Sequence, residues 1–125
     1  MRVLVVHNRY QQPGGENSVF AAGTSVLRSR RHDVIEYVED NDRIDGMRPW
    51  TVAANTLWSR SSQRKIRDII RARRPDLTHF HNTFPLVSPA GYAPCRDEGV
   101  PVVQTLHNYR LMCPKSLLLL RWASL

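Results

Sequence analysis

The chain has 125 residues, 42% of them hydrophobic and 23% charged, which is enough for one globular domain with a substantial core. Its formal net charge of +7 favours anionic partners: nucleic acid, an acidic membrane surface or phosphorylated small molecules. The apolar runs "VLVV" and "LLLL" are far shorter than the roughly 20 residues that span a bilayer, and Cys95 and Cys113 have neither metal-site nor disulfide-framework spacing. We therefore expect a cytoplasmic protein with reduced thiols.

The hydrophobic pattern alternates between strand-like and helix-like segments. "RVLVV" is a β-branched run typical of a strand buried on both faces, and from Glu16 the apolar residues recur at three- and four-residue steps, as in a helix. In chain order we predict strand 2–6, helix 16–30, strand 33–38, an acidic loop 39–49, one long helix or two short ones over 50–73, strand 75–80, a short helix within 88–98 that breaks near Pro94, and strand 100–106. This order predicts an α/β fold with a mostly parallel sheet and helices on both faces.

The same periodicity predicts which helix residues are buried. On the first helix the stripe consists of Val19, Phe20, Ala22, Gly23, Val26 and Leu27, and on the second helical stretch of Leu57, Ile66, Ile69 and Ile70. Where the first helix ends, Arg31 occupies the position at which a glycine usually takes the left-handed conformation. A residue other than glycine costs about 1 kcal/mol there, which the fold should tolerate.

Three of the four predicted strands lead into the same dipeptide: His7-Asn8, His81-Asn82 and His107-Asn108. In an open parallel sheet, ligands bind beyond the carboxyl ends of the strands, so these pairs would lie in one crevice. Imidazole and carboxamide groups suit the hydroxyls and phosphate oxygens of a polar ligand. The alternative is that each pair only ends a strand, because Asn favours turns and His fills half-buried sites.

A paired glycine at the turn after the first strand adds a second polar element. Gly14 and Gly15 have no side chains, so backbone N–H groups at the start of the following helix can approach an anion. The segment is neither the G-x-G-x-x-G fingerprint nor a Walker loop. Most such pairs are only turns, and it is the position in the same crevice that favours a binding role.

Two other kinds of site are weaker hypotheses. His79 and His81 would face the same side of a strand, and a third metal ligand from His7 or His107 is conceivable, but no carboxylate or thiolate completes a site, so we expect no metal. The stretch 59–75 would place five arginines on one helix face, opposite the isoleucines: Arg60, Arg64, Arg67, Arg71 and Arg74. Because no aromatic residues interleave, a solvated face is favoured over specific nucleic-acid binding, with contact to an anionic membrane left open.

Three segments, "MRVLVVHNRYQQPGGENSVF", "HFHNTFPLVSP" and "GVPVVQTLHNYRLMCP", together resemble the N-terminal domain of family 4 retaining glycosyltransferases. These are two-domain GT-B enzymes that transfer a sugar from a nucleotide sugar to an acceptor, without a cofactor. The resemblance extends to about Lys115 and implies a Rossmann-like domain that forms the acceptor side of the enzyme, in polysaccharide or glycolipid synthesis.

The resemblance also implies residue roles. Gly14 and Gly15 would lie against the donor diphosphate, with Glu16 opening the helix, and His107 would sit beside the reacting sugar as the catalytic residue. The residues expected on the acceptor side of the cleft or next to it are Asn8, His81, Asn82, Thr83, Asn108, Tyr109 and Arg110.

The sequence departs from the family after residue 115. Residues 1–115 read as the family domain and 116–125 as an apolar tail unlike it, so we expect a chain truncated before the donor-binding domain and inactive alone. An uncovered fourth strand would favour self-association or pairing with a separate donor domain. The alternatives are a non-catalytic interaction module that uses this sheet edge and, less favoured, a basic binder of nucleic acid or of the inner membrane face.

Overall fold

The computed structural model describes residues 1–9 and 14–107. Its elements, in chain order, are β1 (Arg2–Arg9), α1 (Gly15–Ser29), β2 (Asp33–Asp40), the 3-10 helix η1 (Asn41–Gly46), α2 (Pro49–Leu57), α3 (Arg60–Arg73), β3 (Leu77–Asn82), the 3-10 helix η2 (Pro89–Gly91), α4 (Tyr92–Asp97) and β4 (Val102–Gln104). The four strands form one sheet in the order β2-β1-β3-β4, and every pair is parallel. The expected α/β fold is confirmed.

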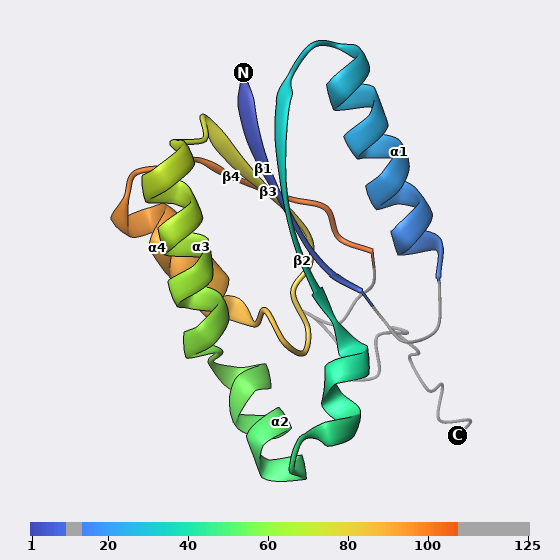
Figure 1. The fold of residues 1–125 in the computed structure, drawn as a ribbon, viewed down its shortest axis with the longest axis vertical. Helices are drawn as coiled ribbons and strands as arrows, with labels where there is room; N and C mark the ends of the chain where they lie inside the picture. The colour runs from blue at the N-terminus through green and yellow to red at the C-terminus, as the bar shows by residue number, and fades with distance from the viewer. Residues whose placement is uncertain (10–13, 108–125) are drawn as a thin grey trace, which may run out of the picture.

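The sheet is covered on both faces (Figure 1). Helix α1 lies on one side, where Phe20 packs against Val3 and Val5 of β1. Helices α3 and α4 lie on the other, where Leu4 and Val6 pack in the main core with residues of α3 and β3. Because β1 is central, its side chains from Val3 to Asn8 are all buried. The "RVLVV" run reads as a strand buried on both faces for this reason.

The contact face of α1 differs from the expected stripe. Phe20 and Thr24 are its buried residues, whereas Val19, Ala22 and Val26 are exposed. The helix therefore meets the sheet along the four-residue step from Phe20 to Thr24, and the exposed valines lie to the side of that line. Because Thr24 in this line is polar, a pattern based on apolar residues alone does not predict the orientation of the helix.

The second helical stretch is two helices, separated at residues 58–59. Ser59 caps α3 by accepting a hydrogen bond from the Ser62 amide, while its own amide donates to Ser88 Oγ. Ile66 and Ile70 are buried as expected, but the prediction that Leu57 is buried was wrong, because no residue of α2 is buried.

The remaining local predictions met mixed outcomes. Arg31 has φ 62°, so the expected left-handed residue is confirmed. The helix near Pro94 does not break there: α4 runs from Tyr92 to Asp97, with Pro94 in its first turn, where a missing N–H costs no hydrogen bond. The acidic loop contains η1, whose first turn Asp40 caps by accepting from the Asp42 amide.

Strand β4 is shorter than predicted, three residues instead of seven, and lies at an edge of the sheet. Val102 and Val103 are 42% and 48% exposed. The strand edge anticipated from the sequence is thus uncovered among the described residues. No helix within these residues is long and apolar enough to cross a membrane.

Candidate functional site

Four histidines gather where β1, β3 and the segment after β4 end: His7, His79, His81 and His107, named here the imidazole cluster. The ring centroids of His79 and His81 are 4.3 Å apart, and those of His81 and His107 are 5.4 Å apart. His7 meets His81 edge-on at 6.3 Å. The expectation that His79 and His81 face the same side of β3 is confirmed. The order β1-β3-β4 brings together residues a hundred positions apart in the chain.

Neighbouring polar groups fix the rings. The His7 ring stacks on Phe20 of α1 at 4.7 Å, and its Nε2 lies 2.7 Å from Asn17 Oδ1, so Nε2–H donates to that amide oxygen. His79 Nε2 is 2.8 Å from Thr105 Oγ1. His81 Nδ1 and His107 Nε2 are 3.2 Å apart, a distance at which one N–H donates to the lone pair of the other ring.

His81 owes its place to an irregularity in the sheet. Val6 of β1 pairs with Phe80, but the next residue, His7, pairs with Asn82, so His81 is the extra residue of a β-bulge. A bulge re-aims the side chain of the inserted residue, and bulges recur beside binding sites. The His81 ring accordingly points toward α1, where it meets Phe20 edge-on at 5.5 Å.

The cluster is electrostatically tuned toward neutral imidazoles. Burial, followed by the charges that His79, His107 and His7 would carry, lowers the pKa of His81 to about 4. Burial also lowers the pKa of the other three rings. Near neutral pH the cluster therefore offers uncharged donors and acceptors, which suit sugar hydroxyls. His7 Nδ1 is buried and has no hydrogen-bond partner among the described residues.

The asparagines of the first two His-Asn pairs have a different environment. Asn8 is fully buried: its amide nitrogen donates to Asn41 Oδ1 at 2.7 Å, and its oxygen accepts from the Leu86 amide at 3.0 Å. Asn82 donates to the Asn8 carbonyl at 3.0 Å, and Thr83 is buried beside it. These residues join the end of β1 to η1 and to the loop after β3, so they stabilise the strand ends that carry His7 and His81.

The start of α1 has an open backbone. A side chain added at Gly15 would meet nothing within 4 Å, whereas a Cβ at Gly14 would lie 2.5 Å from a carboxylate oxygen of Glu16. Glu16 is folded back over Gly14, the N-cap, which has no side-chain capping bond. An acidic group thus occupies the helix N-terminus, where an anion is favoured. The Glu16 charge also acts on His7 and His107, raising their pKa values against burial.

The model of Glycosyltransferase Family 4 matches residues 2–124. The chain belongs to this family. No curated protein and no solved structure matches the chain significantly. The resemblance that the three sequence motifs carry is confirmed, as is the Rossmann-like half domain that it implied.

Within this glycosyltransferase domain, some predicted site residues lie beyond what the structure describes. Asn108, Tyr109 and Arg110 fall outside the described residues, as does the boundary expected between residues 115 and 116, which stays a prediction. Among residues 1–9 and 14–107, no group of three or more His, Cys, Asp or Glu side chains is arranged to hold a metal ion.

Sequence reasoning missed the residues that orient the rings of this family 4 domain. Asn17 hydrogen-bonds His7, Phe20 stacks on it, and Thr105 meets His79. Asn17 and Phe20 are in the first two turns of α1, the helix that starts beside the end of β1. A polar or aromatic residue at the start of a helix that follows a strand would have been the sequence signal for a contact with the histidine at the end of that strand.

Proposed function

We propose that this chain forms the acceptor-side domain of a glycosyltransferase that transfers a sugar from a nucleotide sugar to a sugar acceptor, in polysaccharide or glycolipid synthesis. The main support is the imidazole cluster itself. It brings His107 into hydrogen-bonding contact with His81, beside the start of α1, in a family 4 domain.

The donor diphosphate is assigned to the start of α1. Gly15 leaves room beside the backbone, and a helix N-terminus attracts anions through its free N–H groups. The Glu16 carboxylate now lies over Gly14, so a bound diphosphate would displace it. The charge of the diphosphate would then take the place of the Glu16 charge that acts on His107.

The sugar is assigned to His107, with His81 behind it. The ring of His107 uses Nε2 toward His81, and its Nδ1 is left to donate to or accept from a hydroxyl of the ligand. Because His81 holds one nitrogen of His107 at 3.2 Å, the orientation of the His107 ring is fixed. A His107 ring held in place before the reaction would increase the rate of sugar transfer, because catalysis depends on the geometry at the reacting carbon.

The second wall of the cleft is assigned to a donor domain, on the same or on a separate polypeptide, or to a second copy of the chain. The 125-residue chain alone should therefore bind nucleotide sugars weakly and turn them over little. We place its action in the cytoplasm, with no metal or other cofactor required.

The test is a titration of the labelled chain with UDP- and GDP-sugars, followed by amide and imidazole NMR shifts. We expect shifts at residues 14–16 and 107, weakened in Gly15→Val and His107→Ala but not in His32→Ala, whose histidine precedes β2 at the opposite end of the sheet. Folded wild-type chain that shows no shifts with any nucleotide sugar, or equal shifts in all variants, would contradict the proposal. Turnover by the wild type that disappears in His107→Ala would mean that the chain completes a cleft by itself.

A second candidate is a non-catalytic interaction module, favoured by the uncovered edge of β4. Val102 and Val103 are exposed on a strand whose outer edge has no partner among the described residues. Two results together would favour this function over sugar transfer. Light scattering would show that the wild type is a dimer and that Val103→Lys is a monomer. The wild type would show no NMR shift when nucleotide sugars are added.

A further inference from the structure

A hollow lies at the end of the molecule opposite the imidazole cluster. Its lining comes from the segment that leads from α3 into β3, within residues 70–76, and from the segment that leads from α4 into β4, residues 98–101. It therefore lies at the amino ends of two paired strands. The volume is about 460 Å³, within the range of small-molecule sites. We name it the α3–α4 hollow.

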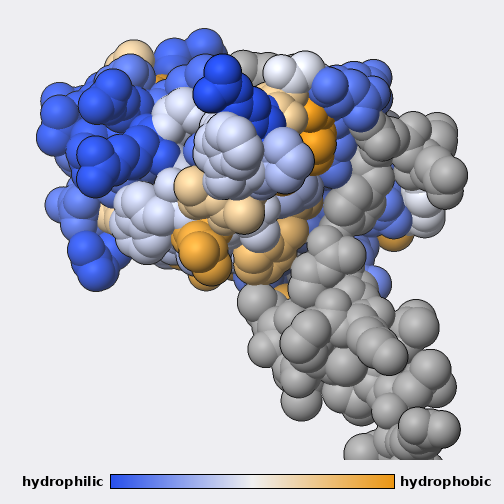
Figure 2. Space-filling view, turned by 90° about the horizontal axis from the view of Figure 1, so that it is seen from below, coloured by the Kyte–Doolittle hydropathy of each residue, from blue (hydrophilic) through white to orange (hydrophobic). Residues whose placement is uncertain are grey.

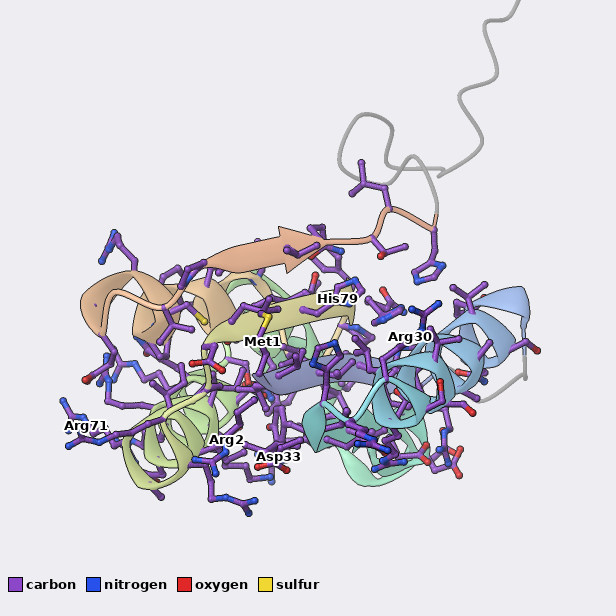
Figure 3. All side chains as sticks on the ribbon, turned by 90° about the horizontal axis from the view of Figure 1, so that it is seen from above. Met1, Arg2, Arg30, Asp33, Arg71 and His79 are labelled. Atoms are coloured by element: carbon purple, nitrogen blue, oxygen red, sulfur yellow. The ribbon has the colours of Figure 1, made fainter. Side chains whose placement is uncertain are left out.

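The hollow is separate from the candidate glycosyltransferase site. Figure 3 looks down on the end of the molecule that holds the hollow, where Arg71 projects from α3 at the border of the fold. Figure 2 views the opposite end, toward which the strands run and where η1 and α2 lie. The imidazole cluster lies at that opposite end, so no residue of the cluster lines the hollow.

The floor of the α3–α4 hollow is apolar. Ile70 belongs to the main core and is 3% exposed, and Val100 packs against that core. Pro75 is buried, and Pro101 is exposed at the border of the hollow. Two proline rings and two branched aliphatic side chains therefore offer a surface on which the apolar part of a ligand can be removed from water.

The charged groups of the lining balance one another. Two are cationic, Arg71 and Arg74, and two are anionic, Asp76 and Glu98. Arg71 and Glu98 are matched, because Arg71 Nε donates to Glu98 Oε1 at 2.7 Å. Arg74 and Asp76, in contrast, form no ion pair within residues 1–9 and 14–107. One positive and one negative side chain are thus left for a ligand.

This balance decides the class of ligand. A ligand with one charge would meet one matching and one opposing group, whereas a zwitterion matches both. A plain anion is further disfavoured, because α3 and α4 both end at the hollow and a helix C-terminus carries partial negative charge. Asp76 Oδ2 already accepts from the Arg2 amide at 2.6 Å, but Oδ1 has no hydrogen-bond partner in the described part of the chain.

We propose that the α3–α4 hollow binds a zwitterionic amino acid or dipeptide with an apolar side chain. The ligand carboxylate accepts from the Arg74 guanidinium, whose planar shape suits paired hydrogen bonds, and the ligand ammonium donates to Asp76. The apolar side chain lies over Ile70 and Val100. Such a ligand connects the segments that precede β3 and β4, so its binding stabilises the folded chain.

The experiment is a titration of the labelled full chain with leucine, phenylalanine and leucylleucine, followed by backbone amide NMR shifts. We expect saturable shifts at Asp76, Glu98, Gly99 and Val100. Glycine, which lacks the apolar group, should bind about tenfold more weakly than leucine. Tighter binding of leucine than of leucylleucine assigns the hollow to free amino acids, the reverse order assigns it to dipeptides, and either order supports the proposal.

Analogues and variants test the two charges. N-acetylleucine and leucinamide each lack one charge of leucine and should bind about threefold more weakly. Arg74→Gln and Asp76→Asn should each lower the affinity for leucine about threefold, the effect of one exposed ion pair. The asparagine keeps an oxygen that can accept from the Arg2 amide, so the fold is preserved. Arg64→Gln and Asp68→Asn, exposed on α3 outside the lining, are the matched controls and should not change the affinity.

The proposal is overturned if no zwitterion shifts these amides at millimolar concentration, or if inorganic phosphate shifts them as strongly as leucine, because the hollow would then be an anion site. It is also overturned if the two analogues bind as tightly as leucine, or if the control variants lose as much affinity as the variants of the lining. The hollow shares no residue with the imidazole cluster or the start of α1, so its failure is distinguishable from failure of the glycosyltransferase assignment.

Discussion

A fall in pH from 7 to 5 should destabilise this protein through His81. The folded chain holds the pKa of His81 at about 4, against an ordinary value of 6.5, because the ring is 3% exposed and surrounded by other imidazoles. Between these two values the unfolded chain binds the proton and the folded chain does not, so the free energy of unfolding falls as pH falls. For His81 alone the loss is about 2 kcal/mol from pH 7 to pH 5 and about 3 kcal/mol at pH 4, below which it levels off.

Urea unfolding at pH 7 and pH 5, in wild type and His81→Gln, measures this contribution. The variant should lose about 2 kcal/mol less than the wild type between the two pH values, because glutamine cannot titrate. His32→Gln, distant from the cluster, should lose as much as the wild type. Equal losses in wild type and His81→Gln would refute the reasoning.

Two further substitutions test the frame around the site. Asn8→Ala should lower the free energy of unfolding by about 3 kcal/mol in urea titrations, because it removes two buried hydrogen bonds and leaves the Leu86 N–H without its partner. Asn55→Ala on α2 is the control. An equal effect of both substitutions would contradict the role of Asn8 in joining the strand ends. Arg31→Gly should raise the stability by about 1 kcal/mol in thermal unfolding, because glycine adopts φ 62° without the backbone strain of arginine. Arg30→Gly, at φ −86°, should lower the stability. The reverse order of the two variants would show that the backbone at Arg31 is not strained.

Much of the frame could be predicted because its signals are local. A β-branched run such as 2–6 has few alternatives to a buried parallel strand, and strand-helix alternation leaves few topologies. The spacing of Ile66 and Ile70 identified the buried face of α3 for the same reason. Motif order then carried the family assignment, which the family model confirms over residues 2–124.

The rest depends on contacts that no local pattern records. Periodicity shows that Leu57 lies on an apolar stripe, but not that the stripe of α2 faces outward. The His81 bulge exists only in the pairing of β1 with β3, strands separated by α1, β2, α2 and α3. Thr105 and Asn17 become ring partners only after the sheet has formed.

The repeated His-Asn dipeptide is best explained as a division of roles set by strand geometry. Successive side chains of a strand point to opposite sides, so the two members of a pair cannot serve the same surface. His7 faces Phe20 of α1, whereas Asn8 turns to Asn41 and Leu86. In the second pair His81 joins the imidazole cluster and Asn82 bonds back to the Asn8 carbonyl. In these two pairs the two readings of the motif therefore apply to different members: the asparagines hold the strand ends together, and the histidines belong to the cluster to which the proposed function assigns the ligand.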